Sequence, residues 1–243
     1  MITLAVDSSH DTLHLALKGK DVHYSISFTI RRRYTEELMN EIELALLKCS
    51  LTFKDLDLLV CSKGPGSFTG LRVAMSSIKG ISLALGIPYV SVSTLETYAY
   101  PLLYAHSPVL VLLDAKKQRY YGAIFDKGER VTADLDLTIE EICNLVTHYD
   151  SLILSGPDSI EAKSKIDTIK DKFAIFPHLI LDNLQNREYG PALIALGEAL
   201  YAHSGEDDIS SGPTYVRLSD AEVSLIEKIN NNKEHKEESH EQK

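Results

Sequence analysis

The chain has 243 residues, of which 44% are hydrophobic and 25% charged, as in ordinary soluble globular proteins. Its formal net charge of −10 argues against RNA binding by this subunit alone, because phosphate contacts need clustered Lys and Arg side chains. The three cysteines are widely spaced, which indicates neither a disulfide framework nor a zinc site and fits a reducing cytoplasm. Without a basic leader or an apolar run of membrane-spanning length, we expect a cytoplasmic protein with no membrane anchor.

The first hundred residues predict one α/β unit. Apolar stretches between turn residues indicate strands, and apolar residues three or four apart indicate helices. In chain order we expect strands over 2–6, 12–17 and 22–30, a helix over 34–49, a buried strand over 56–61, and helices over 69–85 and 95–103.

The glycine-rich segment Gly64-Pro65-Gly66-Ser67-Phe68-Thr69-Gly70-Leu71-Arg72 joins the buried strand to the helix over 69–85. Such a loop at a helix N-terminus exposes backbone N–H groups, which bind phosphates and carboxylates. The glycine spacing matches neither the Walker A loop nor the dinucleotide fingerprint. A second interpretation is a tight turn whose glycines let helix and strand approach closely.

The turn after the first strand can also contribute to a phosphate site, because Asp7 follows that strand directly. Its carboxylate either holds a metal or a phosphate, or caps the turn by accepting backbone N–H groups. The candidate nucleotide- or phosphate-binding residues are therefore Asp7, Ser8, Ser9, Gly64, Gly66, Ser67, Thr69 and Gly70. His10 and His14 are interpreted as a turn and a strand-face residue, since four residues along a strand separate them too far to share a metal.

The second half repeats the plan of the first. A strand over 109–113 ends at Asp114 as the first strand ends at Asp7, although for Asp114 the turn-capping interpretation is favoured. Residues 152–157 echo residues 59–65, an apolar strand that runs into Gly-Pro. We expect a duplicated α/β architecture with two mixed sheets flanked by helices. The predicted units are 1–104, rejoined by about 205–222, then 105–204, with a disordered tail over 227–243.

The helices over 34–49 and 69–85 carry more apolar surface than packing on one side of a sheet requires. The second is apolar nearly all round, and its charges lie on one edge. The pair can form half of an intermolecular four-helix bundle, and burial under the rest of the chain is the alternative. The predicted interface residues are Leu38, Met39, Ile42, Leu46, Leu71, Arg72, Met75, Ile78 and Lys79.

With these residues in place, the chain closely resembles the TsaB family, the accessory subunits of bacterial tRNA threonylcarbamoyladenosine synthesis. The segment from Gly64 to Arg72 carries the resemblance. Supporting matches are Leu4-Ala5-Val6-Asp7-Ser8-Ser9, Val92-Ser93-Thr94-Leu95, Leu113-Asp114-Ala115 and Pro213-Thr214-Tyr215-Val216-Arg217, and together they cover about residues 1–218.

The resemblance implies a duplicated fold of the actin, sugar-kinase and Hsp70 type, which is ribonuclease-H-like. It implies a degenerate partner of TsaD, the subunit that transfers the threonylcarbamoyl group to the adenosine beside the tRNA anticodon. The two helices would pair with those of TsaD, or with a second copy in a homodimer, and the ATPase TsaE would join the assembly. tRNA would be reached only through the complex. No cofactor of its own is expected, with ATP or ADP and magnesium at most at a partner interface.

The chain also departs from the family pattern. Tyr34-Thr35-Glu36 stands where the family often has His-Ser/Thr-Glu, and Asp114-Ala115-Lys116 replaces Asp-Ala-Arg. The helical His pair with which TsaD binds its metal is missing from the sequence, so we expect no metal and no catalytic residue. The leading hypothesis is a non-catalytic scaffold that binds and activates TsaD. The alternatives are an independent ATP-binding enzyme of the actin-like class, and a self-sufficient homodimer that binds another protein.

Overall fold

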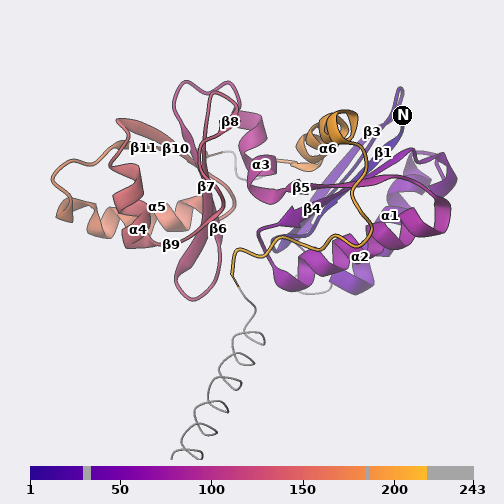
Figure 1. Cartoon of the computed structure of the whole chain (residues 1–243), viewed down its shortest axis with the longest axis horizontal. Coiled ribbons are helices and arrows are strands. Elements are labelled where there is room, and N and C mark those ends of the chain that lie inside the picture. The colour runs from indigo at the N-terminus through magenta and orange to yellow at the C-terminus, as the bar shows by residue number, and fades with distance from the viewer. Residues whose placement is uncertain (30–33, 184–186, 218–243) are drawn as a thin grey trace, which may run out of the picture.

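The computed structural model describes residues 1–29, 34–183 and 187–217. Within them the chain forms two lobes side by side, each built on one β-sheet (Figure 1). The predicted tail over 227–243 lies outside the described residues, as does the end of the predicted strand over 22–30. None of the helices in the described ranges combines the length and the apolarity that crossing a membrane requires.

Lobe 1 contains a five-stranded mixed sheet in the order β3-β2-β1-β4-β5. Its elements are β1 (Thr3–Asp7), β2 (Thr12–Lys18), β3 (His23–Thr29), α1 (Tyr34–Lys48), a 3-10 turn at Phe53–Asp55, β4 (Leu58–Gly64), α2 (Phe68–Leu85) and β5 (Tyr89–Ser93). The predicted strand over 56–61 therefore starts and ends later than expected, and β5 was not predicted. Ser67 caps the N-terminus of α2, and Gly86 ends the helix in a left-handed conformation with φ of 67°.

Lobe 2 contains a sheet in the order β11-β10-β6-β7-β8, with β9 paired to β7. Its elements are β6 (Val109–Asp114), β7 (Arg119–Asp126), β8 (Glu129–Arg130), β9 (Leu135–Thr138), α4 (Ile139–Val146), β10 (Ser151–Ser155), α5 (Ser159–Ile169), a 3-10 turn at Lys170–Lys172 and β11 (His178–Leu181). The order of strands and helices repeats that of lobe 1, with one additional strand, β9, before α4. This confirms the duplicated architecture with two mixed sheets flanked by helices.

Two further helices each follow a strand of one lobe and pack on the sheet of the other lobe. The helix α3 (Thr94–Ala99), which continues as a 3-10 turn over Tyr100–Leu102, follows β5 of lobe 1, and Leu95, Tyr98 and Ala99 join the buried cluster on β6 and β7. The helix α6 (Gly190–Ser204) follows β11 of lobe 2 but packs on the sheet of lobe 1. The chain thus rejoins lobe 1 at Gly190, before the predicted boundary near 205.

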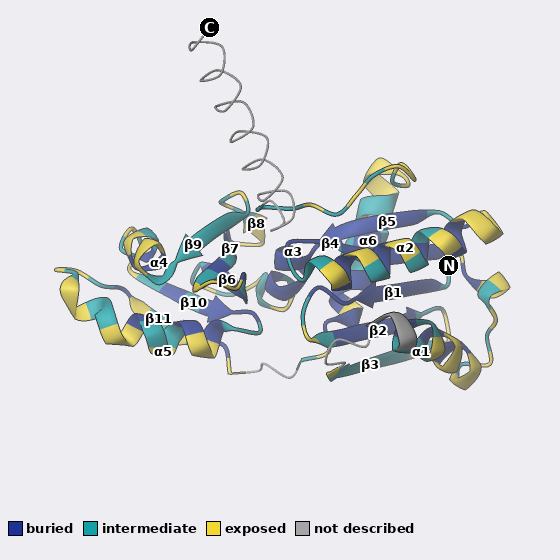
Figure 2. Ribbon diagram, turned by 90° about the horizontal axis from the view of Figure 1, so that it is seen from below, coloured by how far each residue is buried: buried dark blue, intermediate teal, exposed yellow. Residues whose placement is uncertain are grey.

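The sheet of lobe 1 is covered on both faces. One face packs against α1 and α2, and the other packs against α6. Gly197 allows α6 to approach closely, because a Cβ atom there would lie 2.5 Å from Val60 Cγ2. Residues 205–217, which we call the strap, then run along α2 and reach lobe 2 (Figures 1 and 2).

Candidate functional site

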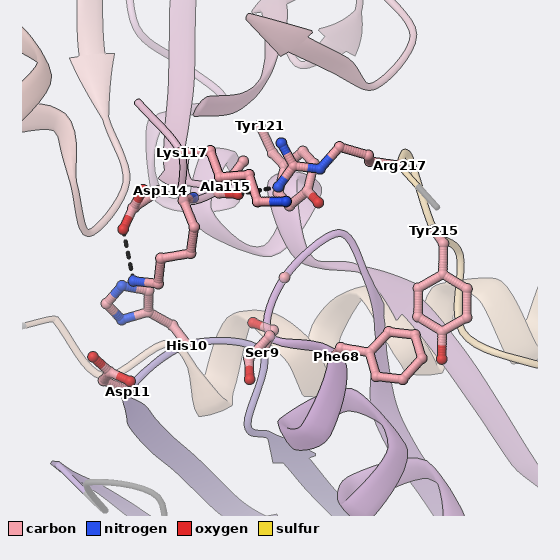
Figure 3. A pocket seen from close by; sticks show the side chains of 13 residues that line it. Ser9, His10, Asp11, Phe68, Asp114, Ala115, Lys117, Tyr121, Tyr215 and Arg217 are labelled. Atoms are coloured by element: carbon pink, nitrogen blue, oxygen red, sulfur yellow. Dashed lines mark hydrogen bonds and ion pairs between the residues drawn. The ribbon is translucent and has the colours of Figure 1, made fainter. Parts of the chain in front are cut away.

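The two lobes face each other through corresponding hairpin turns, residues 8–11 after β1 and residues 115–118 after β6. A cavity of about 390 Å³ lies between them (Figure 3). It is lined by Ser9, His10, Asp11, Gly66, Ser67, Phe68, Asp114, Ala115, Lys116, Lys117, Tyr121, Tyr215 and Arg217. Both lobes and the strap therefore contribute to its wall.

The glycine-rich loop packs directly on the turn after β1. A Cβ atom at Gly70 would lie 1.9 Å from the carbonyl oxygen of Ser8, and one at Gly66 would lie 2.4 Å from that of Ser9. Ser67 N–H donates to the Ser9 carbonyl at 2.6 Å, and Ser8 Oγ donates to the Gly70 carbonyl at 2.8 Å. These contacts support the interpretation of the loop as a close-packed turn. Thr69 of the predicted phosphate set is exposed on the first turn of α2.

Asp7 is buried and does not line the cavity. Its Oδ1 accepts the Ser9 N–H at 2.8 Å, the turn-capping arrangement that carboxylates favour after a strand. Its Oδ2 is buried without a hydrogen-bond partner among the described residues. A metal or phosphate in the cavity would thus not reach the Asp7 carboxylate predicted to hold it. The described residues contain no cluster of three or more His, Cys, Asp and Glu side chains arranged to hold a metal.

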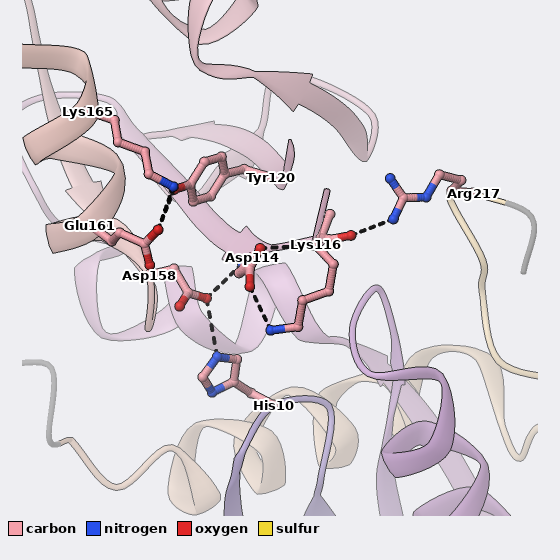
Figure 4. Close-up of polar contacts among 9 residues, drawn as sticks. His10, Asp114, Lys116, Tyr120, Asp158, Glu161, Lys165 and Arg217 are labelled. Atoms are coloured by element: carbon pink, nitrogen blue, oxygen red, sulfur yellow. Dashed lines mark hydrogen bonds and ion pairs between the residues drawn. The ribbon is translucent and has the colours of Figure 1, made fainter. Parts of the chain in front are cut away.

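Asp114 lines the cavity and holds its own turn together. Its Oδ1 accepts the Lys116 N–H at 2.8 Å, and its Oδ2 binds Lys116 Nζ at 2.6 Å (Figure 4). This is the capping role predicted for it. The turn is strained, since Lys116, Lys117 and Gln118 have φ of 60°, 55° and 61° in succession. Lys117 and Gln118 are exposed beside the cavity.

His10 links the two lobes. Its Nε2 lies 3.2 Å from Asp158 Oδ2, just before α5, and the same oxygen accepts the Asp114 N–H at 2.7 Å. Burial lowers the pKa of His10, but the hydrogen bond and charge of Asp158, with the charges of Asp11 and Asp7, outweigh burial and raise the pKa above its ordinary value. Burial raises the pKa of Asp158, and the hydrogen bonds from His10 and Asp114 N–H, together with nearby positive charge, more than reverse this and lower it. The pair favours its charged form.

An aromatic and cationic cluster fixes the strap to the start of α2. Phe68 and Tyr215 stack with ring centroids 4.7 Å apart, and the Arg72 guanidinium lies 3.8 Å from the centroid of Phe68. Arg72 Nε also donates to Tyr215 OH at 2.9 Å. Further along, Lys79 Nζ donates to the carbonyls of Ile209 and Ser211. Arg217 donates to the Ala115 carbonyl and lies 3.7 Å from Asp136, so the strap joins both lobes.

Most of the predicted interface residues are buried within their own lobe. Leu38, Ile42, Leu46, Met75 and Ile78 are at most 3% exposed because they pack in the core cluster of their own lobe, and Leu71 is fully buried. Met39 is half-buried, and Arg72 and Lys79 contact the strap. The side chains of Tyr34 to Glu36 lie outside the description. Replacing Leu71 and Met75 by Glu would therefore damage the fold itself.

Other apolar side chains of the same helices face outward. Leu44 and Leu47 on α1 are 40% and 73% exposed, and Leu83 and Leu85 on α2 are 70% and 40% exposed. Both helices lie side by side on one face of the sheet (Figures 1 and 2). Because each helix leads into a strand of the parallel pair β4 and β5, their C-terminal turns, which carry these leucines, lie at the same end of the lobe.

The duplicated lobes define the class of protein. A structure from Pseudomonas aeruginosa described as similar to peptidase YEAZ has a TM-score of 0.71 at 21% identity, covering 89% of this chain and 99% of that one. A ROK family glucokinase from Streptomyces griseus has a TM-score of 0.51 at 8% identity, covering 82% and 100%. The fold is that of the actin-like ATPases and sugar kinases.

Sequence comparison narrows this class. The family described as TsaD, tRNA N6-adenosine threonylcarbamoyltransferase, matches residues 29–203. A Bacillus subtilis protein named tRNA threonylcarbamoyladenosine biosynthesis protein TsaB is 27% identical over 93% of this chain and 99% of its own length. A TsaB of Buchnera aphidicola from Schizaphis graminum is 36% identical over 50% of this chain, which spans 59% of that protein. The chain belongs to this TsaD-related family and, within it, to the TsaB (YeaZ) proteins.

Sequence reasoning missed the contacts between distant segments. Asp158 was not singled out, and His10 was interpreted only as a turn residue. Tyr215 and Arg217 stood out through the family resemblance alone. An aromatic residue two positions before an arginine in a polar segment is nevertheless a sequence pattern that a segment packed against the rest of the chain can show.

Proposed function

We propose that this chain is the non-catalytic scaffold subunit of the cytoplasmic complex that makes threonylcarbamoyladenosine in tRNA, and that it binds and activates TsaD. TsaE joins the assembly, and tRNA is reached through the complex. The names of the TsaB relatives support the pathway. The observation that carries the binding role is the outward-facing leucine set on α1 and α2.

The outer face of these helices suits a protein partner. Leu47 and Leu83 are large apolar side chains that are more than two-thirds exposed in the isolated chain. On α2, the exposed positions before Leu83 include Ser76 and Gly80. Because these residues are small, they allow a helix of the partner to pack closely. We therefore place the contact with TsaD on the outer face of both helices, around Leu44, Leu47, Leu83 and Leu85, in place of the buried residues expected from sequence.

Nucleotide binding by this chain alone is the competing proposal, and the cavity between the lobes favours it. The residues present fit ATP and magnesium poorly. The Ser67 N–H donates to Ser9, the Gly70 N–H lies 3.3 Å from Ser67 Oγ, and Asp7 does not line the cavity. We propose that ATP or ADP with magnesium, where the complex uses it, is held with a partner's residues. Calorimetry of the isolated chain with ATP and magnesium tests this, and micromolar binding would favour the competing proposal.

Reconstitution tests the function. TsaD, TsaE, threonylcarbamoyl-adenylate and unmodified tRNA are combined with and without this chain, and tRNA nucleosides are measured by mass spectrometry. We expect threonylcarbamoyladenosine only when the chain is present. Equal modification in its absence would contradict the scaffold role. Full activity of a Leu47→Glu/Leu83→Glu variant would mean that TsaD contacts another surface of this chain.

A further inference from the structure

The two edges of the lobe 1 sheet differ in how they are covered. The edge formed by β5 is closed by the strap, where Asp207 N–H donates to the Tyr89 carbonyl and Asp207 Oδ2 accepts the Ser91 N–H at 2.9 Å. At the opposite edge, β2 is the only strand in the described part of the chain that pairs with β3. Every residue of β1 and β5 is buried, whereas β3 has no buried residue.

The devices that usually protect a sheet edge are missing from β3. Proteins discourage pairing at an edge with Lys or other charged residues, Pro, bulges or very short strands. Residues 22–29 contain no Lys, Arg, Asp, Glu or Pro, and β3 pairs with β2 over seven residues without a register shift. Within the described part of the chain, β3 is thus open to a further strand.

The sequence of β3 indicates what that further strand is. It reads His23-Tyr24-Ser25-Ile26-Ser27-Phe28-Thr29, which is nearly the same in both directions about Ile26. An antiparallel second copy centred on Ile26 would place Tyr24 opposite Phe28, Ser25 opposite Ser27, and Ile26 opposite itself. Aromatic pairs and Ser pairs directly opposite each other stabilise antiparallel strands.

The hydrogen-bond pattern fits the same register. Gly19 N–H donates to the Val22 carbonyl at 2.8 Å, so this pair closes the hairpin as a hydrogen-bonded pair. Since such pairs alternate along an antiparallel ladder, Tyr24, Ile26 and Phe28 direct their backbone groups to β2. Ser25 and Ser27 then direct theirs to the open edge, where in the two-fold arrangement they face each other as hydrogen-bonded pairs.

We propose that a second copy of this chain pairs with β3 through this edge, which joins the two lobe 1 sheets about a two-fold axis at Ile26. The interface is isologous, since the same residues contribute from both copies. It uses the backbone edge of β3, whereas the proposed TsaD contact uses the outer leucines of α1 and α2, so the two contacts depend on different residues. This departs from the expectation that a homodimer uses the two helices.

Paired charges test the register. His23 and Thr29 are exposed and occupy opposite ends of β3, so substitutions there leave the fold of one copy intact, yet the two positions meet across the proposed axis. We expect His23→Lys/Thr29→Glu to preserve or strengthen the dimer, and Lys at both positions or Glu at both to weaken it. The dissociation constants should differ by about tenfold or more. The Lys/Lys and Glu/Glu variants change the net charge in opposite directions but both place like charges opposite each other. Weakening in both variants therefore shows repulsion between the paired positions and not an effect of net charge.

Sedimentation equilibrium of the full chain gives the readout. The proposal predicts a wild-type dimer that dissociates only in the like-charge variants, and an Ile26→Cys variant that oxidises to a cross-linked dimer while Ser25→Cys does not. A wild type and a Lys/Glu variant that stay monomeric at all concentrations would overturn it. So would a dimer that ignores positions 23 and 29 but is lost on Leu47→Glu/Leu83→Glu, because that result places self-association on the helices.

Discussion

The helix pair of lobe 1 and its counterpart in lobe 2 occupy the same positions in a repeated topology but present different surfaces. The helices α1 and α2 have 15 and 18 residues, whereas α4 and α5 have 8 and 11. Leu47 and Leu83 are mostly exposed on the first pair. The longer helices therefore offer four exposed leucines, whereas the shorter ones carry one large exposed apolar side chain, Ile160.

The charges on the two pairs are arranged differently as well. On α5, Lys163 pairs with Asp167 and Lys165 with Glu161, both at i,i+4 spacing on the exposed surface, as is usual for a helix that faces water. On α2, Arg72 and Lys79 contact the strap instead. Duplication has thus supplied two equivalent helix layers, and we infer that the first serves a partner while the second faces solvent.

The largest effect is expected inside the lobe 1 layer. Leu71→Glu should destabilise the protein by more than about 4 kcal/mol, because Leu71 is fully buried and an unpaired carboxylate would be desolvated there. Urea unfolding followed by circular dichroism measures this, with Leu83→Glu on the outer face as the matched control. Similar stability of the two variants would contradict the assignment of inner and outer faces.

TsaD binding should respond strongly to changes on the outer face of α1 and α2. Leu47→Glu/Leu83→Glu should raise the dissociation constant for TsaD by about 100-fold or more with little change in stability, since apolar anchors dominate interfaces. The control is Ile160→Glu on α5, where the wild-type side chain is 49% exposed, and calorimetry is the measurement. Loss of TsaD binding in the Ile160→Glu control alone would mean that the interface lies on lobe 2.

A moderate effect is expected at the strap. Tyr215→Ala removes the stack on Phe68 and the acceptor of Arg72, and should cost about 1–2 kcal/mol in unfolding free energy. Tyr104→Ala, at a 95% exposed tyrosine, is the control and should be neutral. Equal losses for both tyrosines would show that the strap contributes nothing specific.

The smallest effect concerns pH. The raised pKa of His10 gives stability that is complete below its ordinary value of 6.5 and is lost as the pH rises through the folded value. The lowered pKa of Asp158 gives stability that is complete above its ordinary value of 3.8 and is lost as the pH falls through the folded value. The contact is therefore strongest between pH 3.8 and 6.5.

His10→Gln should lose about 1 kcal/mol within that window and progressively less at higher pH. Urea unfolding at pH 5.5 and pH 8.5 measures the difference between wild type and variant. A difference that is unchanged or larger at pH 8.5 would mean that His10 does not act through its charged form.

Much of the fold could be predicted from the sequence, because local periodicity and turn residues decide it. The two helices of lobe 1 began and ended within about a residue of expectation, and the repeat at Asp7 and Asp114 revealed the duplication. The exchange of α3 and α6 between lobes could not be predicted, since nothing in the periodicity of α6 states which sheet it covers.

The candidate site was harder to predict for a physical reason. Apolar spacing marks the face of a helix that is buried, and it does not distinguish burial under the same chain from burial under a partner. Leu71 and Met75 were therefore chosen for the interface, while Leu47 and Leu83, which lie off the main apolar row, were overlooked. The contacts of His10 with Asp158 and of Arg72 with Tyr215 join residues more than 100 positions apart, beyond the reach of local patterns.

Hydroxyl-radical footprinting of the wild-type chain with and without TsaD, read by mass spectrometry, would show directly which lobe TsaD covers. Leu47 and Leu83 on the lobe 1 helices and Ile175 in lobe 2 are largely exposed in the free chain, and Ile160 in lobe 2 is about half exposed. We expect TsaD to protect Leu47 and Leu83 from oxidation and to leave the oxidation of Ile160 and Ile175 unchanged. Protection of the two isoleucines, with the two leucines still reactive, would contradict it.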